Sequence, residues 1–380
     1  MSQLHLVLLA AAIGAASLGA HALTLDEALA MAEGHAPDLV ASNAAISAAQ
    51  SLTKSAGALP DPKLSVWVDD LKTSGPDGYR VGEATRMFSL MQEVPNGDLR
   101  DAERRIASAQ LQTSEAQGRY ARVNVRRETT LAWLSLYFLD RKAEVLAAQE
   151  ADNRHSQQVS MAALKGGAPA DAALVARLER DQLDDARDEL ARDRARTRAQ
   201  LARWIGPEAA SQPVTGTLPA WLAEAHAQVD DVADQPEVRA ATTLLGTAQA
   251  ELAMAQAAKK PNWGVEVGWG YDAMDENMAM VKLTFDLPVF AASRQDPKIA
   301  AALANVQKGE AERQARMADY RQQIAEVQAE QTAIRAQIDR LKTRTLPLIN
   351  QQTEVALAGM KSGKGSSNAV LDARKARLAT

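Results

Sequence analysis

Hydrophobic and polar positions alternate along the segment from Trp263 to Leu287. Between Trp263 and Tyr271 every odd position is aromatic or valine, and every even position is glycine or glutamate. A polar, turn-like segment at 272–277 follows, and the alternation then resumes. A period of two residues is typical of a β-strand, and two such strands with a polar connection indicate an antiparallel hairpin. The pattern predicts a β-hairpin over residues 262–287.

The two faces of this hairpin differ in chemistry. One face is rich in Trp, Tyr, Phe, Val and Leu, whereas the other carries Gly together with Glu266, Lys282 and Thr284. A half-buried soluble sheet has this pattern, and so does a membrane barrel with apolar residues toward lipid and polar residues toward a water-filled lumen. Glu266 and Lys282 either pair across the strands or are solvated separately.

A weaker hairpin precedes this one. Leu64, Val66 and Val68 occupy alternate positions, and a second alternating run ends at Pro95. This predicts a hairpin over residues 63–95. The order of helix, proline, hairpin, proline, long helix and glycine-rich turn then occurs twice along the chain, which indicates an internal repeat.

The repeat sets the predicted domain boundaries. Repeat 1 spans residues 23–205, a linker spans 206–234, and repeat 2 spans 235–380. In repeat 1, two long helical segments surround the turn at 165–169 and predict a helical hairpin of coiled-coil type. After the second glycine-rich turn only residues 366–380 remain, so the closing helix of repeat 2 is expected to be cut short. The fold class is therefore α+β and mostly helical.

Residues 1–22 have the features of a secretory signal peptide. An apolar run from Leu6 to Leu18 precedes an Ala-His-Ala cleavage site that ends at Ala22. A membrane anchor is the alternative, but the run is short for a span. We expect cleavage, with Leu23 as the first mature residue and the mature chain outside the cytoplasm.

Composition excludes several function classes. The net charge of −5 gives no basic surface for nucleic acid, and the chain has no cysteine. The five histidines are scattered and no catalytic motif is present, so the sequence predicts neither an enzyme nor a cofactor, and no metal site. Met274, Met278 and Met280 lie near carboxylates at the expected hairpin tip. They form either a contact for a soft cation or a polar loop with flexible apolar filling.

Two hairpins supply four strands, too few to close a membrane barrel by themselves. Open sheet edges are not stable in lipid, and single-chain barrels begin at eight strands. If the hairpins are embedded in a membrane, several chains must share one barrel. The alternative is a small soluble sheet that caps a coiled coil.

Motifs along the whole mature chain carry a family resemblance. They are Leu25-Asp26-Glu27-Ala28-Leu29, Ala36-Pro37-Asp38-Leu39, Gln92-Glu93-Val94-Pro95 and Val370-Leu371-Asp372-Ala373-Arg374. With the duplication, they make the chain similar to the TolC-like outer-membrane efflux channels. The resemblance implies a homotrimer with a twelve-stranded barrel in outer-membrane lipid and a long helical tunnel in the periplasm. It also implies docking to a periplasmic adaptor protein and an inner-membrane pump.

Within that family, Asp69-Asp70-Leu71, Gly75-Pro76-Asp77, Met87 and Met91-Gln92-Glu93 are similar to the heavy-metal efflux branch. The expected function is thus a passive exit duct of a tripartite pump that exports heavy-metal cations. Two alternatives remain open. One is a drug or other small-molecule channel of the same fold, and the other is a periplasmic coiled-coil adaptor or scaffold.

The resemblance also suggests site residues. Asp372 matches a position that contributes to an acidic ring at the tunnel entrance, although Ala369 replaces the second acid of the family's pair. An ordinary exposed helix acid is the alternative for Asp372. The two glycine-rich turns, with Gly166, Gly167, Gly363 and Gly365, are the expected adaptor-docking tips, and each is also a plain connection between helices.

Overall fold

The computed structural model describes residues 22–76, 78–167, 170–224, 231–362 and 367–379. The predicted signal peptide lies outside these residues except for Ala22. The chain forms two compact units. Unit 1 comprises residues 1–36, 125–225 and 334–380, and unit 2 comprises residues 37–124 and 226–333. These units cut across the repeats, because each unit contains segments from both halves of the chain. The repeat boundaries inferred from the sequence stay a prediction.

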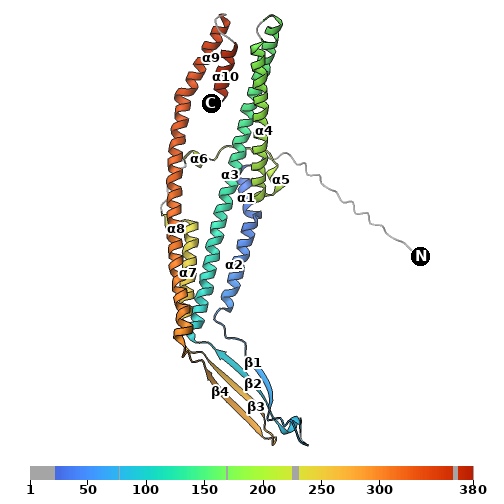
Figure 1. Ribbon diagram of the computed structural model, residues 1–380, viewed down its shortest axis with the longest axis vertical. Coiled ribbons are helices and arrows are strands. Elements are labelled where there is room, and N and C mark those ends of the chain that lie inside the picture. Colours follow the sequence, from blue (N-terminus) through green and yellow to red (C-terminus); the bar gives the residue numbers. More distant parts are fainter. Residues whose placement is uncertain (1–21, 77, 168–169, 225–230, 363–366, 380) are drawn as a thin grey trace, which may run out of the picture. The chain divides into compact units, whose positions relative to one another are not determined.

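Unit 2 contains a four-stranded antiparallel sheet. Its strands are β1 (Lys63–Asp69), β2 (Thr85–Val94), β3 (Trp263–Tyr271) and β4 (Asn277–Phe285). They lie in the order β1-β2-β3-β4, so the two hairpins join through the β2–β3 pair (Figure 1). In the described part of the chain, β1 and β4 each have a neighbouring strand on one side only. The predicted mostly helical α+β class with four strands is confirmed.

Strand β4 begins earlier than the sequence pattern indicated. Pairing continues up to Tyr271 and Asn277, so only the five residues between them form the turn. Met278 and Met280, which the sequence placed at the hairpin tip, therefore lie within the strand. The prediction for these two residues was wrong because their apolar neighbours masked the period of two at the start of β4.

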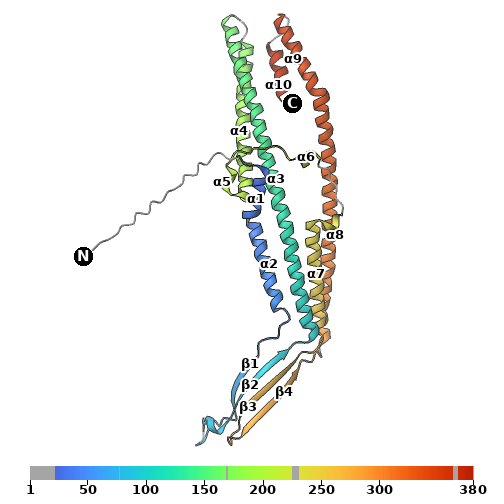
Figure 2. The same cartoon turned by 180° about the vertical axis from the view of Figure 1, so that it is seen from behind.

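The helices of unit 2 pack closely through small residues. They are α2 (Pro37–Ser55), the first part of α3 (Gly97–Lys165), α7 (Pro236–Ala257) and the first part of α8 (Ala291–Arg340). Helix α7 lies along α8, where Gly309 faces Leu245 (Figures 1 and 2). The hydroxyls of Thr113 and Thr247 join α3 to α7 at 3.2 Å. Within the described residues, none of the helices is both long and apolar enough to cross a bilayer.

Unit 1 consists of helices and short connecting turns. The helices are α1 (Leu25–His35), the second part of α3, α4 (Asp171–Ile205), α5 (Pro207–Ala210), α6 (Ala220–Glu224), α9 (Leu346–Lys361) and α10 (Ser367–Ala379). Short 3₁₀ turns lie at Val81–Glu83 in unit 2 and Val232–Asp234 in the linker.

Helix α1 starts with the predicted capping box, in which Thr24 and Glu27 satisfy each other's backbone N–H groups.

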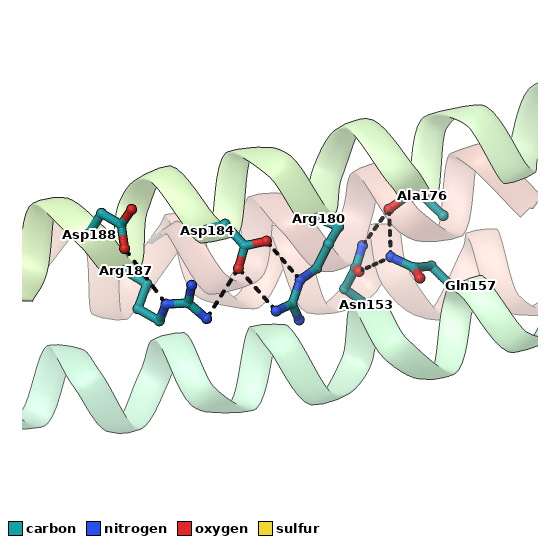
Figure 3. A network of polar contacts seen from close by, with 7 residues as sticks. All are labelled: Asn153, Gln157, Ala176, Arg180, Asp184, Arg187 and Asp188. Atoms are coloured by element: carbon teal, nitrogen blue, oxygen red, sulfur yellow. Dashed lines mark hydrogen bonds and ion pairs between the residues drawn. The ribbon is translucent and has the colours of Figure 1, made fainter.

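Helices α3 and α4 form the long antiparallel hairpin that the sequence predicted. Leu146, Leu183 and Leu190 make its apolar core. A buried amide interrupts this core: Asn153 of α3 donates to the carbonyl of Ala176 in α4 at 3.0 Å and accepts from Gln157 at 2.8 Å (Figure 3). A single buried amide of this kind fixes the register of paired helices, because any shift leaves it without a partner.

A π-helical turn separates α8 from α9. It spans Leu341–Thr345, and Pro347 follows it as the second residue of α9. Proline has no N–H, and its ring clashes with the carbonyl four residues earlier in a regular helix. The wider π turn relieves that clash, so the helix continues past the proline without ending.

The first described residues are anchored to α3 through a buried tryptophan. Trp133 is 1% exposed, and its indole N–H donates to the carbonyl of Leu23 at 3.0 Å. The Leu23 N–H in turn donates to Pro213 at 2.9 Å, and Thr215 donates back to Leu23 at 3.3 Å. The start of the linker is therefore held against the helices by backbone pairing with Leu23.

Replacement of this indole tests the anchor. We expect Trp133→Phe to lower the free energy of unfolding of unit 1 by about 1–3 kcal/mol, because one buried hydrogen bond is lost and the smaller ring leaves a cavity. Trp221→Phe, at an exposed position in α6, should change it by less than about 0.5 kcal/mol. Denaturant unfolding followed by far-ultraviolet circular dichroism measures both variants. Equal stability of the two variants would contradict the anchoring role.

Candidate functional site

One face of the four-stranded sheet is apolar and exposed. The strand register aligns Leu64, Leu90, Val267 and Val281 in one row across all four strands. Other exposed apolar side chains of this face are Val66, Phe88, Trp263, Trp269, Leu283 and Phe285. A continuous exposed apolar surface of this kind marks a site that contacts lipid or another protein.

The opposite face mixes methionines, small residues and charges. Its central rows are Lys63–Met91–Glu266–Lys282, Ser65–Ser89–Gly268–Met280 and Trp67–Met87–Gly270–Met278. Thr284 lies on the same face, opposite Gly264. The structure therefore brings the three predicted polar-face residues together on one surface, and we call this surface the polar face.

Glu266 is the best-partnered charge on the polar face. Its side chain is only 12% exposed, and the Lys282 ammonium lies 3.5 Å from one carboxylate oxygen. The Ser89 hydroxyl donates to the other oxygen at 2.5 Å. Of the two interpretations that the sequence left open, paired or separately solvated, the pair is present. Lys63 and Glu93 form a second pair at 2.6 Å, so these four charges compensate one another.

The glycines of β3 allow the strands and side chains of the polar face to approach closely. A β-carbon at Gly270 would lie 2.1 Å from the Arg86 carbonyl oxygen and 2.7 Å from Met87 Cγ. At Gly264 it would lie 3.1 Å from the Met91 terminal methyl. The alternation of glycine with large residues in β3 is thus a packing requirement of the β2–β3 pair.

The tip of the β3–β4 hairpin uses its carboxylates for its own structure. Asp272 accepts from the backbone N–H groups of Met274 and Glu276, both at 2.8 Å. Asp275 has a positive φ of 66° and forms an ion pair with Arg86. These carboxylates fix the turn and join it to β2, which argues against their use as ligands for a soft cation.

The predicted docking tip at the end of the α3–α4 hairpin is described in part. Gly166 donates to the carbonyls of Ala162 and Ala163, and Gly167 donates to Leu164 with a φ of 91°. This positive φ is accessible to glycine without strain, so Gly167 ends helix α3. The matching residues of the second tip, Gly363 and Gly365, lie outside the described residues.

Helix α10 presents Asp372 to solvent. Val370 and Ala373 on the same helix are buried, and the Lys375 ammonium lies 3.8 Å from Glu179 of α4. A cavity of about 260 Å³ lies beside this ion pair, between α3, α4 and α10. The buried Val370 and Ala373 and the Lys375–Glu179 ion pair hold α10 in place, and the Asp372 side chain on the same helix is exposed to solvent.

Sequence reasoning missed two features of the polar face. Ser89 was not identified as the partner of Glu266, and Met87 and Met91 were not placed beside Met278 and Met280. Both features depend on the pairing of β2 with β3, which joins residues far apart in the chain. Among the described residues, no group of three or more His, Cys, Asp or Glu side chains is arranged to hold a metal ion.

Comparison with known proteins identifies the fold. No family model matches the chain. The cobalt-zinc-cadmium resistance protein CzcC of Cupriavidus metallidurans is 24% identical over 373 residues, which cover 93% of this chain and 83% of the relative. The outer-membrane protein VceC of Vibrio cholerae has a TM-score of 0.75 at 19% identity, with 93% of this chain and 90% of that chain covered.

A second solved structure agrees with this result. The Campylobacter jejuni CmeC outer-membrane channel has a TM-score of 0.78 at 15% identity, with 93% of this chain and 80% of that chain covered. These likenesses confirm the resemblance to the TolC-like outer-membrane efflux channels at the level of the fold. They extend over nearly the whole chain, including the sheet and the long helices.

Substitutions at two glycines of β3 test the packing of the polar face. Gly270→Ala forces its new methyl group against the Arg86 carbonyl, so we expect it to destabilise the sheet by about 1–3 kcal/mol. Gly264→Ala meets only the flexible end of Met91 and an ordinary backbone contact, and it should retain a protease-resistant sheet. Limited proteolysis of the purified variants compares them, and equal resistance would refute the requirement at Gly270.

Proposed function

We propose that the chain is a passive outer-membrane exit duct of a tripartite efflux pump. Three copies share one barrel in the outer membrane, and their long helices extend into the periplasm. The chain performs no chemistry, and an inner-membrane pump supplies the energy. The expected partners are a periplasmic adaptor protein, that pump and outer-membrane lipid.

The separation of chemistry between the two faces of the sheet carries this proposal. One face is apolar and exposed over all four strands, whereas the other combines paired charges, serines and glycines with Trp67 and four methionines. In a membrane barrel the apolar side faces lipid and the polar side faces water. Strands β2, β3 and β4 have nine or ten residues, which suits a tilted span, whereas β1 has seven.

The two outer edges of the sheet support assembly of several copies. β1 and β4 end the strand order of the described chain, and each has one edge without a neighbouring strand. An unsatisfied backbone group in lipid costs several kcal/mol, so a membrane sheet must close. Three copies with β4 of one beside β1 of the next give a closed barrel of twelve strands.

The proposed cargo is a heavy-metal cation. CzcC, the curated relative, is named as a cobalt-zinc-cadmium resistance protein, and its likeness covers nearly the whole chain. Glu266, Lys282 and Thr284 would then line the lumen, where compensated charges allow an ion to pass without a deep binding well. A drug channel of the same fold and a periplasmic scaffold are the alternatives that the experiments below separate.

The periplasmic end supplies the remaining proposed sites. Three copies of Asp372 would form a single carboxylate ring that attracts cations at the tunnel entrance, and its exposure on α10 is consistent with that role. The two hairpin ends, with Gly166, Gly167, Gly363 and Gly365, would be the surfaces that the adaptor contacts.

Membrane fractionation tests the duct. We expect the protein to stay in the outer-membrane fraction after a carbonate wash, because an apolar barrel face is held by lipid, and to run as a trimer in mild detergent by light scattering. An inner-membrane protein and a periplasmic protein from the same cells serve as controls. Release by carbonate, or a monomer in detergent, would support the scaffold alternative and overturn the duct.

Deletion of the gene tests the cargo. We expect the host strain to become more sensitive to metal cations such as zinc, cadmium, cobalt and silver, and complementation to restore growth, because the exit step of the pump is lost. Growth inhibition is compared with that by several drugs in the same strain. Sensitivity to drugs alone would remove the metal assignment and retain the channel.

A further inference from the structure

The polar face carries more methionine than its polar pattern requires. Met87, Met91, Met278 and Met280 all lie on it, from strands β2 and β4. They are four of the eleven methionines in the chain. Apolar side chains on a face that turns toward water gain nothing from burial in lipid, so their accumulation there needs a separate reason.

Strand β3 brings these methionines together because its residues on this face are small. The β2–β4 separation across β3 is about 9.5 Å, twice the spacing of paired strands. The terminal methyl of Met280 lies over Gly268, and Met87 Cγ lies over Gly270. Met91 covers Gly264 in the same way. Methionines from both flanking strands therefore cover the central strand.

The other candidate ligands of this face are already engaged. Glu266 accepts from Ser89 and pairs with Lys282, while Glu93 pairs with Lys63. The thioether sulfurs are what remains for a cation. Thioethers are soft donors that select Cu(I)-like ions, whereas borderline divalent ions prefer thiolate, imidazole or carboxylate ligands. The chain has no cysteine, and no His is present in the four strands.

We propose that Met87, Met91, Met278 and Met280 form a contact strip for soft monovalent cations, of the Cu(I) and Ag(I) class, on the polar face. This inference rests on the proposed function for the exposure of that face to a water-filled lumen. The strip binds weakly and reversibly, because a conducting site must release the ion that it attracts. It distinguishes this chain from a duct that handles only divalent cations.

Accessibility differs along the strip. Met87 is 8% exposed, whereas Met278 is 41% exposed. Met278 is therefore the first sulfur that an ion in the lumen reaches, Met280 and Met91 are half-buried, and Met87 lies deeper against the strand. Met274, at the hairpin tip and 82% exposed, is outside the strip and serves as an internal reference.

Methionine oxidation tests the strip in the unmodified protein. The trimer purified in detergent is oxidised with hydrogen peroxide in three parallel samples in chloride-free buffer. One contains silver nitrate, one contains zinc nitrate, and one contains no metal. Mass spectrometry then follows sulfoxide formation at each methionine. We expect Ag(I) to slow oxidation of Met278 and Met280 but not of Met274, and Zn(II) to protect none of them. Equal rates at Met278 with and without Ag(I) would overturn the proposal.

A substitution series tests the same point by direct binding. The four methionines of the strip are replaced by leucine, which nearly conserves volume, and Ag(I) binding is measured by equilibrium dialysis. The matched control replaces four methionines elsewhere with leucine: Met161, Met254, Met274 and Met317. We expect loss of Ag(I) binding in the strip variant and retention in the control.

The outcomes separate this inference from the function on which it rests. If both variants form trimers and bind Ag(I) as the unmodified protein does, the methionines only pack the sheet and the strip is refuted, while the duct stands. If the unmodified protein is not recovered as a membrane trimer, the duct fails before silver is added. The oxidation experiment needs no substitution, so a misfolded strip variant does not prevent a decision.

Discussion

The unpaired backbone groups at the two ends of the sheet are the constraint on which the proposed structure depends. β1 and β4 each carry N–H and C=O groups along an edge that has no neighbouring strand in the described chain. In lipid, as proposed here for this sheet, such groups would have no water to bind. Only pairing with further strands would then satisfy them, and the described residues contain no further strand. That requirement calls for several copies in one barrel, and the number three is what the resemblance to the TolC-like channels implies.

Within the sheet, close packing and charge compensation depend on each other. Gly270 permits β3 to lie against β2, and that pairing brings Ser89 to Glu266. Lys282 from β4 completes the neutralisation of the same carboxylate. A charged residue here would otherwise be costly, because its side chain is largely covered. The polar face therefore combines low net charge with soft sulfur atoms, which suits transit of an ion better than tight binding.

In the helical part, polar contacts set the geometry where apolar side chains are few. The α3–α4 hairpin has a small leucine core, and its register depends on Asn153 and its contact with Ala176. Arg180, Asp184 and Arg187 add a chain of ion pairs along α4 (Figure 3). These pairs, half-buried at Arg180 and Asp184 and exposed at Arg187, contribute little energy individually, but they keep the surface solvated. The same solvated character agrees with a helical section that lies in water and not in lipid.

The sequence by itself determined the elements and the chemistry of each strand face. A period of two residues between Trp263 and Tyr271 is a local property, because side chains on a strand point alternately to opposite sides. The pairing of Glu266 with Lys282 was also within reach, since a short hairpin fixes its own register. Tertiary structure alone decided that β2 lies beside β3, with Met87 opposite Gly270. That contact joins residues far apart in the chain, and no local pattern encodes which distant strand will satisfy a given edge.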